Sequence, residues 1–434
     1  MTEIRRLLLF LPFVILGLGL LLFAANVPIG DDYDAILRYL NHPWPERLVH
    51  LADFHNEHRI IPTRLVSEFV YLVLGQVDFR IIIWIGNIGW WLFAAGFATL
   101  FVRHGGIAKS GAIFATWMLV GYYDQENAFW AMTSVQNHWV IGFAFAACLS
   151  FSRRANTRWF AAALSLAIAA TFTSGSGMLV FPALALMALC DYIFSHDRAF
   201  SKRRIIGTFV FALVAISSCA LYLHDMPRNN DPSLVFPSEP VQRIKGVIGF
   251  FFCFFGNLLP FAWPAFIAGI GIVAWGLAIS WFAPRYRQTS LAIFAFLAFL
   301  VATIIAGAIF RGGDASGGLC GRYRLISIAI IVSLLYLTLV EAQLSEKLKT
   351  RLLLFSLTGC FLLSAVYFAR GLSYNSAHKQ SLNDGLALWP TSVDGLDYPT
   401  NNFGLVHASA ILQKSVENKV FHHQCVKPYK NHLR

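Results

Sequence analysis

Two adjacent carboxylates, Asp31 and Asp32, lie in the segment Gly-Asp-Asp-Tyr-Asp, which directly follows the first long apolar stretch of the chain. Carboxylates beside apolar surroundings can act as general bases or bind a divalent metal ion. Alternatively, Asp31 caps a short helix and Asp32 is solvated. We favour a chemical role because further polar clusters follow. A divalent metal stays an open alternative, and no other cofactor is predicted.

The second polar cluster is the segment His-Asn-Glu-His-Arg that begins at His55 and is followed by Arg64. In a helix, His55, His58 and Arg59 would share one face, with Glu57 beside it. The spacing is not the His-Glu-x-x-His pattern of zinc enzymes, so zinc is not favoured here. Such a run of polar residues indicates a functional site. The alternative is a structural hydrogen-bond hub, and Arg59 and Arg64 could instead anchor lipid head groups.

A third cluster surrounds Glu126 in the segment Tyr-Asp-Gln-Glu-Asn, with Trp130 close behind. Aromatic residues at such a boundary are typical of a membrane-interface belt, and a platform for sugars is the less favoured alternative. An ionisable group near the membrane is costly and is usually paired or functional. Glu126 is therefore a candidate site residue.

The fourth cluster is a glycine-rich segment bounded by Arg311 and Arg324 and containing Arg322 and Tyr323. Glycines can free backbone N–H groups to form an anion-binding concavity, and arginine offers forked donors that fit phosphate. The segment lacks the Gly-Lys-Ser/Thr ending of a nucleotide-binding loop. It predicts a phosphate or pyrophosphate site. The alternative is a flexible turn whose arginines pair with the acids of the first loop.

The elements that position these clusters follow from composition. The chain has 434 residues, of which 57 % are hydrophobic and 13 % charged, and its mean hydropathy is +0.59. These values exclude an ordinary soluble domain and predict an all-α polytopic membrane protein. Apolar runs long enough to cross a bilayer predict about eleven transmembrane helices. They cover residues 7–25, 80–102, 107–123, 130–151, 159–173, 178–194, 205–223, 263–282, 289–310, 325–340 and 352–369.

Charge predicts the orientation of these helices. The N-terminus and the connections assigned to the cytoplasm contain 16 Lys and Arg against 5 Asp and Glu, a difference equal to the whole net charge of +11. This is the positive-inside pattern. The opposite face is neutral, so the basic balance reflects topology and anionic lipid and does not indicate nucleic-acid binding. We predict a cytoplasmic N-terminus and a periplasmic C-terminus.

Two weaker apolar stretches, residues 64–74 and 247–259, are too short or too polar for full spans. We predict that both are helices that lie in the outer interface of the membrane or dip partway into it, and a short tilted span is the alternative for each. The transmembrane domain then covers residues 1–370, with a long first outer loop at 26–79, and residues 371–434 form a small outer segment. A disulfide between Cys320 and Cys425 stays open, since both are predicted on the oxidising side.

Together, the acidic pair after the first helix, the long first outer loop, about eleven spans and the outer C-terminal segment resemble the GT-C superfamily. Its members are membrane glycosyltransferases that use polyprenyl-phosphate sugars. Within it, the chain is most similar to bacterial enzymes that modify lipopolysaccharide O-antigen or related surface glycans. The match in motif is carried by Asp31 and Asp32 and, less closely, by residues 311–324.

The resemblance implies an inverting enzyme of the bacterial inner membrane that moves a sugar from a polyprenyl-phosphate donor to a glycan or lipid-linked acceptor on the periplasmic face. Asp31 or Asp32 would take the acceptor proton, and arginines would hold the donor phosphate. The implied catalytic residues are Asp31, Asp32 and Glu57. The implied phosphate-binding residues are Arg311, Arg322 and Arg324. The implied substrate-binding residues are His55, His58, Arg59, Arg64, Glu126 and Tyr323.

Two other functions compete with this interpretation. A flippase or transporter of lipid-linked sugars would also need outer arginines, but it should carry ionisable residues midway along its helices, where this chain has almost none. An O-antigen polymerase or ligase would rely mainly on outer-loop arginines, and the early acidic pair argues modestly against it.

Overall fold

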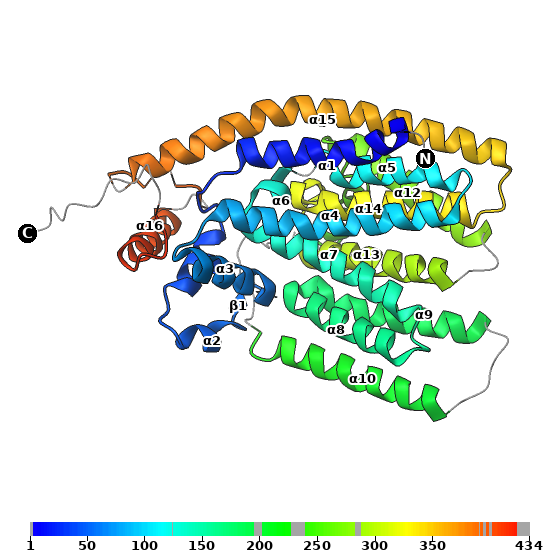
Figure 1. The fold of residues 1–434 in the computed structure, drawn as a ribbon, viewed down its shortest axis with the longest axis horizontal. Coiled ribbons are helices and arrows are strands. Elements are labelled where there is room, and N and C mark those ends of the chain that lie inside the picture. Colours follow the sequence, from blue (N-terminus) through cyan, green and yellow to red (C-terminus); the bar gives the residue numbers. More distant parts are fainter. Residues whose placement is uncertain are drawn as a thin grey trace, which may run out of the picture.

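The computed structural model describes residues 3–123, 125–194, 202–226, 239–282, 288–389, 391–393, 396–398 and 402–422. Long helices lie side by side in one bundle, and short elements gather at one end of it (Figure 1). Cys425 lies outside the described residues, and so therefore does its suggested disulfide with Cys320.

A helix overlaps each apolar range that the sequence marks as a span. These helices are α1 (Glu3–Phe23), α4 (Phe79–His104), α5 (Ala108–Val120), α7 (Ala131–Phe151), α8 (Thr157–Thr173), α9 (Val180–Phe194), α10 (Lys202–Leu223), α12 (Ala262–Phe282), α13 (Gln288–Arg311), α14 (Arg324–Val340) and α15 (Glu346–Leu388). Among the described residues, 8 helices are long and apolar enough to cross a membrane, and α5, α7 and α8 are not among them. The chain is thus an all-α, multi-pass membrane protein, while the count of about eleven spans stays a prediction.

The outer surface of the bundle is apolar. Leu7, Phe10, Trp263, Ile267 and Phe355 are each at least 60 % exposed. A protein in water rarely leaves so many large apolar side chains uncovered on neighbouring helices. In a bilayer these side chains contact lipid tails, while each helix satisfies its own backbone hydrogen bonds. The surface therefore agrees with the membrane assignment made from composition.

Close packing of α4 against α7 depends on small residues. A Cβ atom on Gly86 would lie 2.3 Å from Oγ of Ser134, and one on Gly89 would lie 2.4 Å from the ring of Trp139. Only glycine permits this approach, and small residues serve the same purpose in other membrane helix pairs. The two helices form the centre of the bundle, and α7 also packs on α8 and α13.

The last long helix, α15, has 43 residues. At 1.5 Å per residue it is about 65 Å long, roughly twice the thickness of the hydrocarbon layer. It runs along the bundle to the end where α16 (Asn402–Glu417) lies (Figure 1). The domain boundary predicted at residue 370 therefore falls inside a continuous helix.

The short elements at that end form a unit that we call the cap. It consists of η1 (Tyr33–Arg38), α2 (Glu46–His50), β1 (Phe54–His55), β2 (His58–Arg59), α3 (Ile61–Leu74) and α16. The ends of the first loop meet where Oδ1 of Asn26 accepts a hydrogen bond from the N–H of Phe79 at 2.9 Å. The C-terminal segment joins the same unit, because the N–H of Val77 donates to the carbonyl of Val420 at 2.7 Å.

The cluster that begins at His55 is a short hairpin and not a helix. His55 and His58 are paired across the antiparallel strands β1 and β2. Asn56 in the turn has a φ of 51°, a left-handed conformation that asparagine tolerates better than most residues. The shared helical face that we considered for His55, His58 and Arg59 is therefore not formed.

Both weaker apolar stretches are helical, in α3 and in α11 (Pro240–Phe255). Helix α3 is amphipathic: Arg64 and Val70 are buried, while Leu65, Phe69 and Leu72 are at least 50 % exposed. Helix α11 packs against α12 and against η4 (Ala315–Leu319), inside the glycine-rich segment. Three further short helices are α6 (Gln125–Phe129), η2 (Gly175–Leu179) and η5 (Gly321–Tyr323).

Candidate active site

The two adjacent carboxylates have different environments. Asp31 keeps 30 % of its side chain exposed, and its Oδ1 lies 3.6 Å from Nε2 of His55. Burial favours the neutral acid, but the contact with His55 and the charge of Arg322 outweigh it and lower the pKa of Asp31 below its ordinary value. Asp31 is therefore ionised at neutral pH.

Asp32, by contrast, is fully buried. Its Oδ2 accepts a hydrogen bond from the N–H of Ile29 at 3.1 Å, and its Oδ1 accepts one from the N–H of Met132 at 2.9 Å. Burial raises the pKa of Asp32 to about 8 despite these two donors. The carboxyl thus ties the start of the first loop to the start of α7 and is withdrawn from any substrate.

A third carboxylate, Asp34, belongs to the same surface. The hydroxyl of Tyr398 donates to its Oδ2 at 2.7 Å, and Nε2 of His407 lies 2.9 Å from its Oδ1. Burial opposes ionisation, yet these two contacts lower the pKa of Asp34. Both partners come from the C-terminal segment, which therefore helps to build the site. No spacing in the sequence connects Asp34 with residues so far away.

A cavity of about 390 Å³ lies beside these carboxylates. Its size falls in the range of small-molecule sites, which is roughly 300–1,000 Å³. The lining is mostly polar and ionisable, and it includes Asp31, Asp34, His42, His50, Asp53 and His55. Two of the three acids in the first cluster, Asp31 and Asp34, and His55 from the second cluster therefore contribute to one cavity.

Sequence reasoning missed His42, His50 and Asp53. The only local signal was two histidines shortly after the acidic cluster, in a segment that also contains Trp44 and Pro45. Nothing in that signal indicated that the segment folds back toward Asp31.

Glu57 lies outside the cavity lining and forms an ion pair with Arg311. Nη1 of Arg311 also donates to the hydroxyl of Tyr323 at 3.1 Å, and Tyr323 stacks on Phe254 with ring centroids 4.6 Å apart. The second and fourth sequence clusters are therefore in direct contact. This is the pairing between loop arginines and first-loop acids that the sequence left as an alternative.

His58 lies next to this ion pair, with its Nε2 atom 3.6 Å from Oε1 of Glu57. Its Nδ1 accepts a hydrogen bond from the N–H of Gly175 at 3.3 Å. Burial, followed by the charges of His55 and Arg322, lowers the pKa of His58 to about 4. The ring is therefore neutral at physiological pH and connects the hairpin to η2.

Arg322 is a candidate ligand for an anion, although it lies outside the lining of the large cavity, which includes Arg38 and Arg64. Within the described part of the chain, its Nε is buried and has no hydrogen-bond partner. Its charge acts on both Asp31 and His58. A buried guanidinium donor without an acceptor is costly, so the site favours an incoming anionic oxygen.

Three further arginines that the sequence singled out donate hydrogen bonds to backbone carbonyls. Arg59 donates from Nε to the carbonyl of Tyr222 at 2.9 Å and lies over the ring of Phe54. Arg324 donates from Nε to the carbonyl of Asn257 at 3.1 Å. Arg64 is 4 % exposed and donates to three backbone carbonyls of the segment between α2 and β1. The contacts of Arg59 belong to the hydrogen-bond hub that the sequence left as the alternative for the cluster at His55.

Glu126 pairs with the glycine-rich segment. Its Oε2 accepts a hydrogen bond from the N–H of Arg322 at 3.0 Å. The N–H groups of Gly312, Gly317, Cys320 and Tyr323 donate to backbone carbonyls. These five N–H groups are therefore not free to form an anion-binding concavity.

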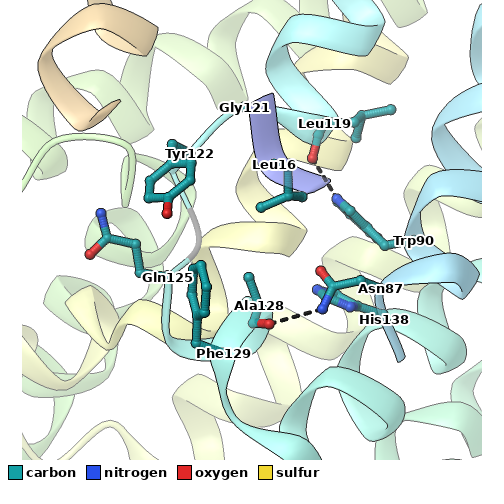
Figure 2. Close-up of a pocket in the computed structure, with 10 residues that line it drawn as sticks. All are labelled: Leu16, Asn87, Trp90, Leu119, Gly121, Tyr122, Gln125, Ala128, Phe129 and His138. Carbon is teal, nitrogen blue, oxygen red and sulfur yellow. Dashed lines mark hydrogen bonds between the residues drawn. The ribbon is translucent and has the colours of Figure 1, made fainter. Parts of the chain in front are cut away.

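A second cavity lies inside the bundle, between α4, α6 and α7 (Figure 2). Asn87, Trp90 and His138 are among its lining residues, and Nδ2 of Asn87 donates to the carbonyl of Ala128 at 2.9 Å. Its volume of about 10 Å³ admits one water molecule at most. It is far too small for a substrate, so the larger cavity is the candidate site.

Comparison with protein families, with curated proteins and with solved structures found no match to this chain. The function is therefore argued from the residues of the site.

Proposed function

We propose that this protein is an inverting membrane glycosyltransferase of the GT-C type, which moves a sugar from a polyprenyl-phosphate donor to a glycan or lipid-linked acceptor. We further propose that it resides in the bacterial inner membrane, with the N-terminus in the cytoplasm and the cap in the periplasm. The observation that carries the proposal is an ionised carboxylate, Asp31, in the wall of a cavity of about 390 Å³ beside the bundle.

Asp31 is the proposed general base. It accepts the proton of an acceptor hydroxyl while that oxygen forms a bond to the anomeric carbon and the bond from carbon to the phosphate oxygen breaks. Attack opposite the leaving phosphate inverts the anomeric centre. Asp32 does not share this role in our proposal, because it is buried and its oxygens accept backbone N–H groups. It positions the loop that presents Asp31.

Arg322 is the proposed ligand of the donor phosphate. Its Nε has no acceptor within the described residues, and its charge already acts on Asp31. A bound phosphate would offset that charge and raise the pKa of Asp31 toward its ordinary value. Donor binding would thus strengthen the base. Arg311 could join Arg322 on the phosphate if Glu57 released it.

Helix α3 suits the lipid part of the donor. Its exposed face carries Leu65, Phe69, Leu72 and Val73, while its buried face packs on η1 and on the bundle helices α4, α7 and α8. An amphipathic helix of this kind lies in the boundary between lipid head groups and acyl chains. A polyprenyl chain in the outer leaflet would then run beside α3, with its phosphate near the arginines.

Mass analysis of surface glycans tests the proposal in cells with and without the gene. We expect deletion to remove one sugar substituent, complementation with Asp31→Asn to leave it absent, and complementation with Asp225→Asn to restore it. Asp225 is a suitable control because it is an exposed carboxylate near the cap whose side chain pairs only with His224 among the described residues.

Unchanged glycans after deletion, or full restoration by Asp31→Asn, would contradict the proposal. Shortened glycan chains would instead indicate a polymerase. Reconstituted protein that moves lipid-linked sugar across vesicles without transferring it would indicate a flippase.

A further inference from the structure

Three possible metal ligands meet on the cavity side of the cap. The ligand atoms of His42, Glu46 and His50 all lie within 4.8 Å of one another. The two imidazole rings are stacked with centroids 4.0 Å apart, and Nδ1 of His42 lies 3.8 Å from Oε2 of Glu46. Glu46 follows His42 by four residues, and the two side chains form an ion pair when His42 is protonated. His42 and His50 also line the large cavity.

His50 is oriented by a carboxylate. Its Nδ1 lies 2.6 Å from Oδ2 of Asp53, which leaves Nε2 of the same ring available as a ligand. Metal-binding histidines usually donate their other ring N–H to a carboxylate or carbonyl in this way. The contact between His50 and Asp53 has this form, and it is independent of the clustering of His42, Glu46 and His50.

The backbone around the cluster is held by buried charges. Nη1 of Arg64 donates to the carbonyls of His50, Leu51 and Asp53 at 2.6–3.1 Å. Arg47 donates from Nε to the carbonyl of His42 at 2.7 Å, and its guanidinium forms a buried ion pair with Glu68 at 3.0 Å. Both histidines are thus positioned by Arg47, which lies outside the cavity lining, and by Arg64, which also lines the cavity.

We propose that His42, Glu46 and His50 bind one divalent transition-metal ion of the Zn²⁺ type at the edge of the cavity, with Asp53 orienting His50. Two imidazole nitrogens and one carboxylate oxygen suit Zn²⁺ better than Mg²⁺ or Ca²⁺, which prefer oxygen ligands. Ligand atoms around tetrahedral Zn²⁺ lie about 3.4 Å apart, so the cluster must contract by up to roughly 1.4 Å. The Glu46 side chain, which is 59 % exposed, is free to supply this movement.

Three protein ligands leave one tetrahedral position for water or an anionic oxygen. The site stands apart from the proposed glycosyl transfer, because it uses none of the residues assigned to the base or to the donor phosphate. An experiment can therefore contradict the metal site without contradicting glycosyl transfer, and it can contradict glycosyl transfer without contradicting the metal site.

Equilibrium dialysis of the purified full-length protein against Zn²⁺, after treatment with a chelator, tests the site. We expect one Zn²⁺ per chain in the wild type and an affinity at least about 100-fold lower in Glu46→Gln and in His42→Gln/His50→Gln. His224→Gln is the matched control, since His224 also contacts a carboxylate, Asp225, at 2.9 Å but belongs to no such cluster in the described chain. It should bind Zn²⁺ like the wild type.

Asp53→Asn tests whether Asp53 orients His50 for the metal or only stabilises the fold. The variant should lower Zn²⁺ affinity by about 10- to 100-fold while the melting temperature of the metal-free protein stays unchanged. Glu46→Gln should fold like the wild type, because the exposed glutamate contributes little to the core. A loss of Zn²⁺ binding in this variant therefore reports on the ligand and not on misfolding. Wild-type affinity and stoichiometry in both Glu46→Gln and the double histidine variant would overturn the proposal. So would the absence of Zn²⁺ binding by the wild type at micromolar concentrations.

Discussion

Nε2 of His55 lies 3.6 Å from Oδ1 of Asp31, and this contact distinguishes Asp31 from its neighbour. The hairpin brings His55 against Asp31 from a position 24 residues further along the chain. Asp31 is thereby held ionised in the cavity wall, while Asp32 is buried beneath it. Two carboxylates that are adjacent in sequence thus have opposite pKa shifts.

This difference predicts different effects of two matched substitutions. Asp31→Asn should lower the rate of sugar transfer by about 10²- to 10⁴-fold, the usual contribution of a general base, without lowering the melting temperature. Asp32→Asn should lower the melting temperature at pH 4, where the buried proton of Asp32 costs the wild type little, because the amide turns an N–H group toward one of the two backbone N–H groups that donate to the carboxyl oxygens. Transfer assays and thermal unfolding in detergent measure both effects. Equal losses of activity and stability in the two variants would contradict the assignment.

The ion pair between Glu57 and Arg311 predicts energetic coupling. Each side chain is no more than one third exposed, so removing one partner leaves the other poorly solvated. We expect Glu57→Gln and Arg311→Gln each to lower the free energy of unfolding. The loss in the double variant should be smaller than the sum of the two single losses by about 1 kcal/mol. A double-mutant cycle on thermal unfolding measures the coupling. Additive effects would show that the contact contributes nothing to stability.

Arg322 should affect donor binding more than folding. Arg322→Gln is expected to raise the KM for the polyprenyl-phosphate donor by about 10-fold or more, since a charge-assisted hydrogen bond contributes roughly 1.5–3 kcal/mol. Arg322→Lys should recover part of the loss, because it restores the charge without the forked donors. Arg370→Gln, at an exposed position on α15, is the control and should leave KM unchanged. A KM that is unaffected by both Arg322 substitutions would remove Arg322 from the donor site.

We expect Arg64 to contribute to the stability of the cap. Arg64→Leu removes a buried guanidinium and leaves three partly buried backbone carbonyls without their donor, so we expect a loss of about 3 kcal/mol of stability. Arg38→Gln should change stability by no more than about 0.5 kcal/mol, because Arg38 is 63 % exposed and its ion pair with Asp34 spans 3.5 Å. Chemical unfolding of both variants checks the difference. Similar stabilities would contradict the role given to Arg64.

Asp32 predicts a pH dependence of stability. Its pKa is about 8 in the folded protein, against 3.8 as the ordinary value that applies to the unfolded chain. Between these pH values the folded protein holds a proton that the unfolded chain has lost, so stability falls as the pH rises toward 8. In Asp32→Asn this contribution is absent, and the decline in melting temperature from pH 5 to pH 8 should be shallower than in the wild type. The same slope in both proteins would contradict the raised pKa.

Much of the fold could be predicted from local pattern. Apolar runs of membrane-spanning length located the long helices, because a helix in lipid must be apolar over its whole length. The segments in α3 and α11 were also recognised as helices, since each has an apolar run interrupted by a polar residue. The hairpin at His55 was not recognised, because its two strands have only two residues each and carry no periodic signal.

By itself, the sequence determined that the chain is an all-α membrane protein and that Asp31, Glu57 and Arg322 belong to polar clusters. Those properties depend on composition and local spacing. Only the tertiary structure decided that Asp31 lines a cavity while Asp32 is buried, that Glu57 pairs with Arg311, and that Tyr398 contacts Asp34. Burial and contacts between residues hundreds of positions apart depend on how helices pack, and no local pattern records that packing.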